Sequence, residues 1–203
     1  MSPHLDLTAP YAPLVRRIES EGSIDGQMLV IDHFLNHRIE PGFIFELAHE
    51  LARRLSFFQP NVILTAEASG IAPALIVAQA LSVPMVYAKK YSTDVEAPSI
   101  CRTIPSPTKK GVETRLAIST RYIRPGQRVV IVDDFLANGR TAAALIEMAR
   151  EAGADVRGAG FVVEKRFKQG REHIEALHVP VSTLAQVERV EDGRVVMTQA
   201  RDA

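Results

Sequence analysis

The sequence predicts an α/β fold in which helices flank a mainly parallel β-sheet. Residues 61–81 and residues 129–152 each carry the strand–turn–helix pattern that is typical of this class. The apolar run from Val129 to Val132 indicates a strand buried on both faces, as the strands of parallel sheets are. Asp133 and Asp134 follow this strand at its carboxyl end, where open α/β sheets bind their ligands. We therefore expect the functional site at this edge of the sheet.

The turn after the two aspartates predicts a phosphate site. Gly139 and Thr141 lead into a helix expected from about Asn138 to Ala152. The unpaired N–H groups and the positive dipole end at the start of this helix favour a phosphate. The neighbouring carboxylates suit hydroxyl groups or a hydrated cation instead. Together, these features predict a site for a phosphorylated sugar.

Hydrophobic spacing and turn residues predict the other elements. We expect helices at residues 13–21, 41–59, 70–81 and 170–178, of which the second has the clearest helical repeat. We expect a short strand running into a turn within residues 28–37, and strands at residues 61–66, 84–88, 113–119, 156–163 and 179–187 and around Tyr122. An Asp-Gly turn at residues 191–194 predicts a closing hairpin. The proline-containing stretch at residues 91–110 predicts a long loop.

The composition fits one cytoplasmic domain. The chain has 203 residues, of which 46% are hydrophobic, and its 24 basic and 24 acidic side chains leave no formal net charge. This balance gives no electrostatic footprint for nucleic acid or for an anionic membrane, so we expect neither partner. The single Cys101 excludes an intramolecular disulfide and fits a reducing compartment. The sequence shows no secretory signal and no apolar run near the about twenty residues that span a bilayer.

The segment from Val129 to Thr141, called the signature segment below, resembles that of a known family. The strand, the Asp-Asp pair, Gly139 and Thr141 are in register with the signature of type I phosphoribosyltransferases, which bind 5-phosphoribosyl 1-pyrophosphate (PRPP). The variant Asp-Asp-Phe-Leu-Ala-Asn-Gly is similar to the xanthine phosphoribosyltransferase branch, as are the segments 34–37 and 164–165. The resemblance implies a type I phosphoribosyltransferase fold in a single domain, residues 1–203, with a core at about 41–165. It also implies a small hood built from residues 22–40 and 166–199.

The same resemblance implies roles for individual residues. It implies that Asp133 and Asp134 are the catalytic pair at the ribose hydroxyls. The ligand contacts form two groups, which are Ala137, Asn138, Gly139, Arg140 and Thr141 at PRPP, and Leu29, Asn36 and Lys165 at xanthine. Mg²⁺ would be held by the substrate and water, with no ligand supplied directly by the protein. The loop at residues 91–110 would close over PRPP, and the chain would form a homodimer.

Several of these residues also have plain structural explanations. Asn36 could cap a turn, and Lys165 could extend from a strand end into solvent. Glu67 and Ser69, in the turn after the strand at residues 61–66, are weaker candidates for a pyrophosphate contact. The Lys89-Lys90 pair fits a solvated strand end and a pyrophosphate contact equally well.

The predicted function is transfer of the phosphoribosyl group of PRPP to xanthine, giving XMP and pyrophosphate in purine salvage. Two alternatives stay open at this point. One is a guanine or hypoxanthine phosphoribosyltransferase of the same superfamily, because an asparagine amide can either donate or accept a hydrogen bond. The other is a non-catalytic regulator that senses PRPP, although the zero net charge disfavours a protein that binds nucleic acid.

Overall fold

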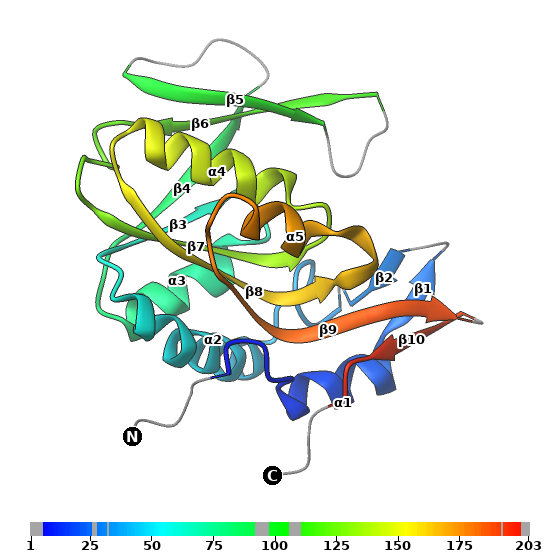
Figure 1. Cartoon of the computed structure of the whole chain (residues 1–203). Coiled ribbons are helices and arrows are strands. Elements are labelled where there is room, and N and C mark those ends of the chain that lie inside the picture. The colour runs from blue at the N-terminus through cyan, green and yellow to red at the C-terminus, as the bar shows by residue number, and fades with distance from the viewer. Residues whose placement is uncertain are drawn as a thin grey trace.

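The computed structural model describes residues 6–25, 28–31, 33–91, 98–105, 111–191 and 193–199. Its centre is an eight-stranded sheet with the order β10-β9-β8-β7-β3-β4-β6-β5 (Figure 1). Strands β4, β3, β7, β8 and β9 are parallel neighbours, while β6 and β5 at one edge and β10 at the other are antiparallel. The mixed, mainly parallel sheet confirms the fold class predicted from the sequence. The strands are β3 (Val62–Ala66), β4 (Met85–Tyr91), β5 (Ser99–Pro105), β6 (Glu113–Ser119), β7 (Arg128–Leu136), β8 (Asp155–Lys165), β9 (Val181–Glu191) and β10 (Arg194–Met197).

Helices cover both faces of this sheet. On one face lie α1 (Ala12–Glu21), α2 (Pro41–Leu55) and α3 (Ile71–Ala80), and on the other lie α4 (Arg140–Glu151) and α5 (Gly170–Glu175) (Figure 1). Short 3-10 helices follow α2 at Ser56–Phe58 and β8 at Arg166–Lys168. No helix in the described part of the chain is long and apolar enough to cross a membrane.

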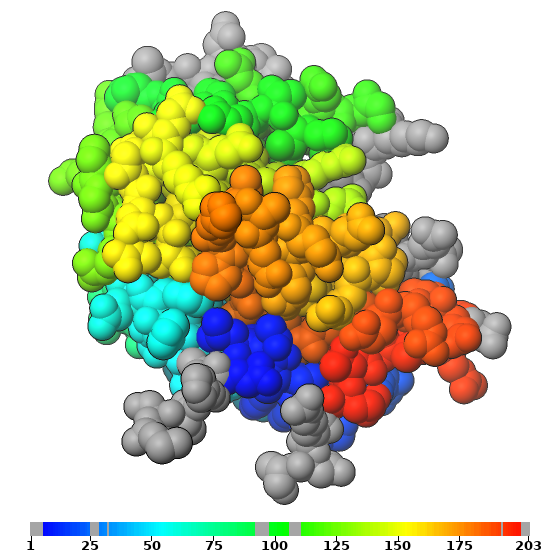
Figure 2. Space-filling model, in the orientation of Figure 1, coloured from blue at the N-terminus to red at the C-terminus, as the bar shows by residue number. Residues whose placement is uncertain are grey.

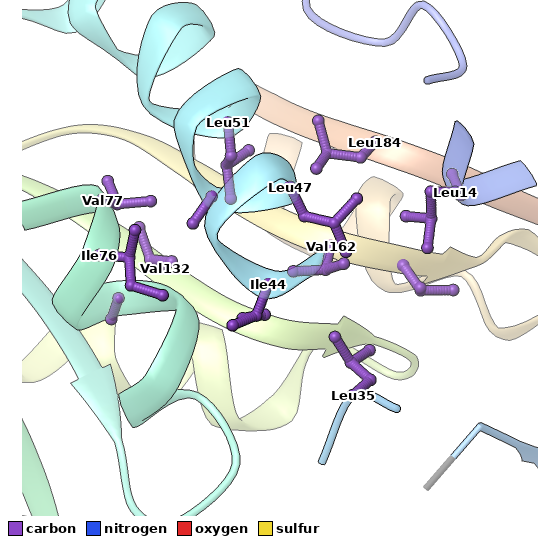
Figure 3. Packing of buried hydrophobic residues seen from close by; sticks show 14 of the residues in the cluster. Leu14, Leu35, Ile44, Leu47, Leu51, Ile76, Val77, Val132, Val162 and Leu184 are labelled. Atoms are coloured by element: carbon purple, nitrogen blue, oxygen red, sulfur yellow. The ribbon is translucent and has the colours of Figure 1, made fainter. Parts of the chain in front are cut away.

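Strand β7 is buried on both faces, as its sequence predicts. Val130 and Val132 belong to the apolar cluster with α1, α2 and α3, whereas Val129 and Ile131 pack with α4. The cause is the two-residue period of a strand, which sends successive side chains to opposite faces. Figure 3 shows Val132 beside Val77 and Ile76 of α3 and close to Ile44 of α2. The strand that carries the aspartates is therefore held by a core on each side.

The N-terminal segment lies beside β9 and close to the C-terminal strand. The Leu7 carbonyl accepts hydrogen bonds from the Thr183 N–H at 3.1 Å and the Ser182 hydroxyl at 2.8 Å. The Tyr11 N–H donates to the Leu184 carbonyl at 2.7 Å. In Figure 2 this segment (blue) is next to β10 (red), on the same face of the molecule. The two ends of the described chain thus form one side of the fold.

A second, two-stranded sheet stands apart from the central one. Strands β1 (Ser23–Asp25) and β2 (Met28–Val30) pair antiparallel, with Ile24 opposite Leu29. Figure 1 shows this hairpin next to β9 and β10. Residues 33–38, which follow β2, form turns that lead to α2. The hood expected at residues 22–40 and 166–199 stays a prediction, as does the division of the chain into core and hood.

Two local expectations were wrong. Residues 99–105, expected in a loop, form β5, which pairs with β6. Its proline, Pro105, is the last residue of an edge strand, where the missing N–H is tolerated. Tyr122, expected in a strand, is exposed and lies in a turn. Its N–H donates to the Ser119 carbonyl at 3.1 Å. The remaining parts of the expected loop, residues 92–97 and 106–110, lie outside the described residues.

The signature segment also differs slightly from its expected boundaries. Strand β7 continues to Leu136, so the two aspartates lie near the end of the strand rather than after it. Helix α4 begins at Arg140 instead of Asn138, because Gly139 adopts a positive φ of 72° that a continuing helix does not allow.

Candidate active site

The predicted site residues meet in one pocket at the carboxyl ends of β3, β7 and β8. Its volume is about 510 Å³, and Leu29, Asn36, Asp133, Asp134, Ala137, Asn138, Gly139, Arg140, Thr141 and Lys165 all line it. Parallel strands bring their carboxyl ends to one edge of the sheet, which explains how residues so far apart in sequence converge. The structure brings the residues together, while their individual roles stay predictions.

The turn between β7 and α4, residues 137–139, forms one wall of the pocket, and we call it the anion-binding turn after the ligand that its geometry suits. Gly139 occupies the N-cap of α4 with its φ of 72°. Its carbonyl accepts the Ala143 N–H at 2.8 Å, the first regular bond of the helix. The N–H groups of the first turn precede this bond and so have no intrahelical acceptor. With the positive end of the helix dipole, they suit a phosphate group.

Glycines allow this turn to pack closely against the start of α5. A Cβ atom on Gly139 would lie 2.9 Å from the Gly170 carbonyl oxygen. A Cβ atom on Gly170 would lie 2.1 Å from the carbonyl oxygen of Ala137. The His173 ring adds a contact, since its Nδ1 lies 3.2 Å from the Asn138 carbonyl oxygen. The backbone of the turn is therefore fixed from behind by α5.

The two aspartates form the acidic wall. The Asp134 carboxyl is 6% exposed and accepts a hydrogen bond from Asn36 Nδ2 at 3.1 Å, while the Asp134 N–H donates to Asp133 Oδ1 at 3.0 Å. Burial, with the charge and hydrogen bonding of Asp134, raises the pKa of Asp133 well above its ordinary value, although Lys90 acts in the opposite direction. Asp133 also lies directly on Gly70, where a Cβ atom would come within 2.3 Å of Asp133 Oδ1. Such a pair gains from hydroxyl donors or a cation beside it.

Lysine and aromatic residues form the third wall. Lys165 Nζ lies 5.0 Å from the centroid of the Phe135 ring, and Phe135 and Phe161 both line the pocket. Leu29 adds a buried apolar side chain from β2. The Asn36 Oδ1 atom is buried and has no hydrogen-bond partner among the described residues. An apolar slot with a donor and a vacant acceptor suits a flat heterocycle with polar edges.

Arg17 of α1 holds the turn that carries Asn36. Its guanidinium carbon lies 4.6 Å from the ring centroids of both Phe34 and Phe43. Its Nη1 atom lies 2.8 Å from the Glu40 carboxylate. This stacked, ion-paired arrangement joins α1, the turn and the start of α2.

The weaker sequence candidates lie partly in the pocket. Glu67, Ser69 and Lys90 line it, whereas Lys89 does not. The Lys90 N–H donates to the Glu67 carboxylate, and the peptide bond after Glu67 is cis. Lys90 and Ser69 thus bring a cation and a hydroxyl to the lining of the pocket.

Other lining residues were missed by the sequence reasoning. Ile104, Pro105 and Thr114 come from β5 and β6, and the first two lie in the segment that was expected to be a loop. Phe135 and Phe161 are apolar residues in strands, which sequence reasoning assigns to the core. Only the position of Phe135, immediately after the aspartates, offered a signal. Among the described residues, no group of three or more His, Cys, Asp or Glu side chains could hold a metal ion.

The fold and the pocket agree with a family match. The model of the phosphoribosyl transferase domain family matches residues 39–191, which include both aspartates and the turn before α4. The chain belongs to this family.

Individual relatives narrow the likeness. A xanthine phosphoribosyltransferase of Chloroflexus aurantiacus is 53% identical over 93% of this chain and 89% of its own length. The xanthine phosphoribosyltransferase of Oenococcus oeni is 39% identical over 92% of this chain and 91% of its own. Among solved structures, the adenine phosphoribosyltransferase of Rhodothermus marinus has a TM-score of 0.69 at 26% identity, covering 87% of this chain and 100% of its own.

Proposed function

We propose that this protein transfers the 5-phosphoribosyl group of PRPP to xanthine, giving XMP and pyrophosphate in purine salvage. The observation that carries the proposal is the convergence of ten residues on one pocket: an anion-binding turn, two carboxylates and a lysine–aromatic wall. The relatives named xanthine phosphoribosyltransferase, which align over most of the chain, support the same substrate.

The reaction joins a purine ring nitrogen to the anomeric carbon of PRPP. The bond from that carbon to pyrophosphate breaks, its electron pair leaves with pyrophosphate, and the ring nitrogen loses its proton. Positive charge develops on the ribose ring and negative charge on the leaving group. Positioning and electrostatic stabilisation therefore contribute more than a covalent nucleophile.

Each wall of the pocket has a place in this scheme. The N–H groups of residues 137–141 and the Thr141 hydroxyl hold the 5′-phosphate. Asp133 and Asp134 orient the ribose hydroxyls, and the carboxylate charge beside the ring stabilises its developing positive charge. Lys90 and Ser69, which also line the pocket, contact the pyrophosphate.

The acidic pair also fits Mg²⁺ that arrives with PRPP. The raised pKa of Asp133 marks a carboxyl group that a nearby cation would stabilise in its charged form. Asp133 and Asp134 would hold the hydrated ion beside the substrate, which would supply most of its other ligands, as is usual for Mg²⁺. When bound, Mg²⁺ neutralises charge on the leaving pyrophosphate.

The base stacks in the slot of Leu29, Phe135 and Phe161. Lys165 donates to an electron-rich edge, and its charge favours xanthine, the most acidic of the 6-oxopurines. The Asn36 amide donates to Asp134, which leaves its oxygen to accept an N–H of the base. Xanthine carries an N–H at ring position three that guanine and hypoxanthine lack in their usual forms, so this acceptor supports xanthine.

We also propose that the enzyme acts in the cytoplasm as a homodimer and that the segment at residues 91–110, which includes β5, closes over PRPP. The pocket-lining Ile104 and Pro105 support the last point, because they put β5 at the edge of the site.

The test is pyrophosphate release with Mg²⁺ and PRPP, comparing xanthine, guanine, hypoxanthine and adenine. We expect xanthine to have the highest kcat/KM, and Lys165→Ala and Asn36→Ala to raise the KM for xanthine about tenfold each, the value of one hydrogen bond to a charged or fixed partner. Lys168→Ala, which removes a lysine of the adjacent 3-10 helix, is the matched control. A preference for guanine or hypoxanthine would show that this base, rather than xanthine, is the substrate. PRPP binding without turnover would indicate a regulator.

A further inference from the structure

Behind the anion-binding turn lies a buried ion pair that the proposed reaction does not use. Glu164, 2% exposed, is the second-last residue of β8, and Arg171 lies in the first turn of α5 with 9% exposure. Arg171 Nε donates to Glu164 Oε1 at 2.9 Å, and Nη2 donates to Glu164 Oε2 at 2.5 Å. The guanidinium therefore meets the carboxylate through two parallel bonds, a geometry that only arginine provides.

The surroundings satisfy most of the remaining polar atoms of the pair. Arg171 also donates to the Val181 carbonyl at 3.3 Å and to the Thr183 hydroxyl at 3.2 Å, and that hydroxyl donates to Glu164 Oε2 at 3.2 Å. Desolvation works to lower the pKa of Arg171, but the bonds and charges of Glu164 and Glu175 raise it overall. A buried pair of this kind gives little net stability, because desolvation offsets the attraction. Its clearest effect is to set the position of α5 against β8 and β9.

The position of α5 matters because α5 touches the anion-binding turn at three places. Gly170, the residue before Arg171, packs against Gly139 and the Ala137 carbonyl, and a single Cβ atom would not fit at either glycine. His173, two residues after Arg171, contacts the Asn138 carbonyl. A shift of α5 therefore moves the backbone that presents its N–H groups to the pocket.

We propose that Arg171, through its paired contact with Glu164, is a positioning residue that fixes α5 and thereby the phosphate-binding turn at residues 137–139. The proposal rests on the proposed binding of the PRPP phosphate at that turn. Arg171 touches no substrate in this scheme, so its loss changes where the N–H groups point rather than removing a reacting group. Since small misplacements of a binding group cost large factors in rate, the expected effect falls on the KM for PRPP.

The test compares Arg171→Lys with the matched control Glu175→Gln. Lysine keeps the charge but loses the second parallel bond. The Glu175 side chain is 49% exposed, and its Oε1 atom lies 3.3 Å from Arg171 Nη1. We expect Arg171→Lys to raise the KM for PRPP about tenfold while the KM for xanthine changes less than about twofold. Glu175→Gln should behave as the wild type. Equal rises in both KM values, or none, would overturn the proposal.

A double variant separates positioning from stability. Glu164→Met/Arg171→Met replaces the pair by apolar side chains, an exchange that often preserves or raises stability. We expect its unfolding temperature to match the wild type while its KM for PRPP stays raised. If the unfolding temperature and the KM for PRPP of the double variant both matched the wild type, the pair would contribute to folding alone and the proposal would be overturned. Failure of the wild type to bind or use PRPP would contradict the proposed function instead, and is read from the same assay before any variant is compared.

Discussion

The two ends of the pocket are built in different ways. The anion-binding end consists of consecutive residues, 137–141, in one turn whose shape depends on glycine conformation and on α5 behind it. The end that we propose binds the base, called the base end below, is assembled from three separate parts of the chain: Leu29 of β2, Asn36 of a turn and Lys165 at the end of β8. Backbone atoms define the first end, and side chains define the second.

This difference has a consequence for specificity. Most substitutions keep the backbone N–H groups of the turn, so we expect the anion-binding end to tolerate changes of its side chains. It should not tolerate a Cβ atom at Gly139, where the backbone packs against Gly170. At the base end, each side chain can be changed with little effect on the others. Within one family fold, base preference is therefore expected to vary through the side-chain end while the phosphate end is kept. Substitutions at the two ends should separate these properties.

The largest effect is expected for Gly139→Ala. Alanine must take a φ of 72°, which costs about 1–2 kcal/mol, and its Cβ would lie 2.9 Å from the Gly170 oxygen. We expect kcat/KM for PRPP to fall about 100-fold, because the displaced turn misplaces the phosphate. Steady-state kinetics with xanthine in excess measures this change. Gly126→Ala, which has a similar φ of 77° but no atom within 4 Å of the new Cβ, should keep activity. Activity retained in Gly139→Ala would contradict a backbone-built phosphate site.

Asp133→Asn should lower activity and raise stability. We expect transfer to fall about 100-fold, since a charge that stabilises the transition state is lost. Folding raises the pKa of Asp133, so its contribution to stability is full below the ordinary value of 3.8 and is lost as pH rises through the folded value. The wild type should therefore gain stability from this group as the pH is lowered from 8 toward 4.

The variant lacks this titrating group, so its unfolding temperature should exceed that of the wild type at pH 8, and the difference should shrink on acidification. Thermal unfolding over this pH range, without ligand, measures both trends. Asp155→Asn, at an exposed ion pair with Arg157, is the control. If the difference in unfolding temperature between Asp133→Asn and the wild type did not depend on pH, folding would not raise the pKa of Asp133.

A smaller effect is expected for Arg17→Lys, which acts on the base end. Lysine cannot stack between Phe34 and Phe43 while pairing with Glu40, so the turn carrying Asn36 loosens. We expect the KM for xanthine to rise about threefold, the free energy of unfolding to fall by about 1 kcal/mol, and the KM for PRPP to stay unchanged. Arg53→Lys, which changes a 60% exposed side chain of α2 that pairs with Glu50, should alter none of these values. A larger change in KM for PRPP than for xanthine would remove the distinction between the two ends.

The position of the turn at residues 137–139 could be predicted from sequence, whereas its binding of a phosphate stays a prediction. A strand, two aspartates, a glycine and a helix follow one another, so local periodicity and the rules of helix starts suffice to place them. The base end was located through resemblance alone, because the position of Asn36 depends on Arg17, and that of Lys165 on the pairing of β8 with β7 and β9. Such contacts between distant segments leave no local pattern.

The contact of α5 with the turn was not foreseen for the same reason. Gly170 looked like a helix boundary, and only the three-dimensional arrangement shows that its missing side chain makes room for the Ala137 carbonyl. Likewise, β5 was hidden because its polar and proline residues lack an alternating pattern, while its pairing with β6 supplies the order. Pairing partners, rather than propensity, decided these elements.

The bonds between the N-terminal segment and β9 tie together stretches that are made at very different times. The Ser182 hydroxyl meets the Leu7 carbonyl across 175 positions of the chain. Because the ribosome releases the N-terminus first, residues 7–11 emerge long before β9, which holds their backbone partners, has been translated. Strands β3 and β7 and helices α3 and α4 have all been translated once residue 151 is added. At that stage the nascent chain already contains Leu29 and Asn36 but still lacks Lys165 and α5, so both ends of the pocket are completed only later in translation.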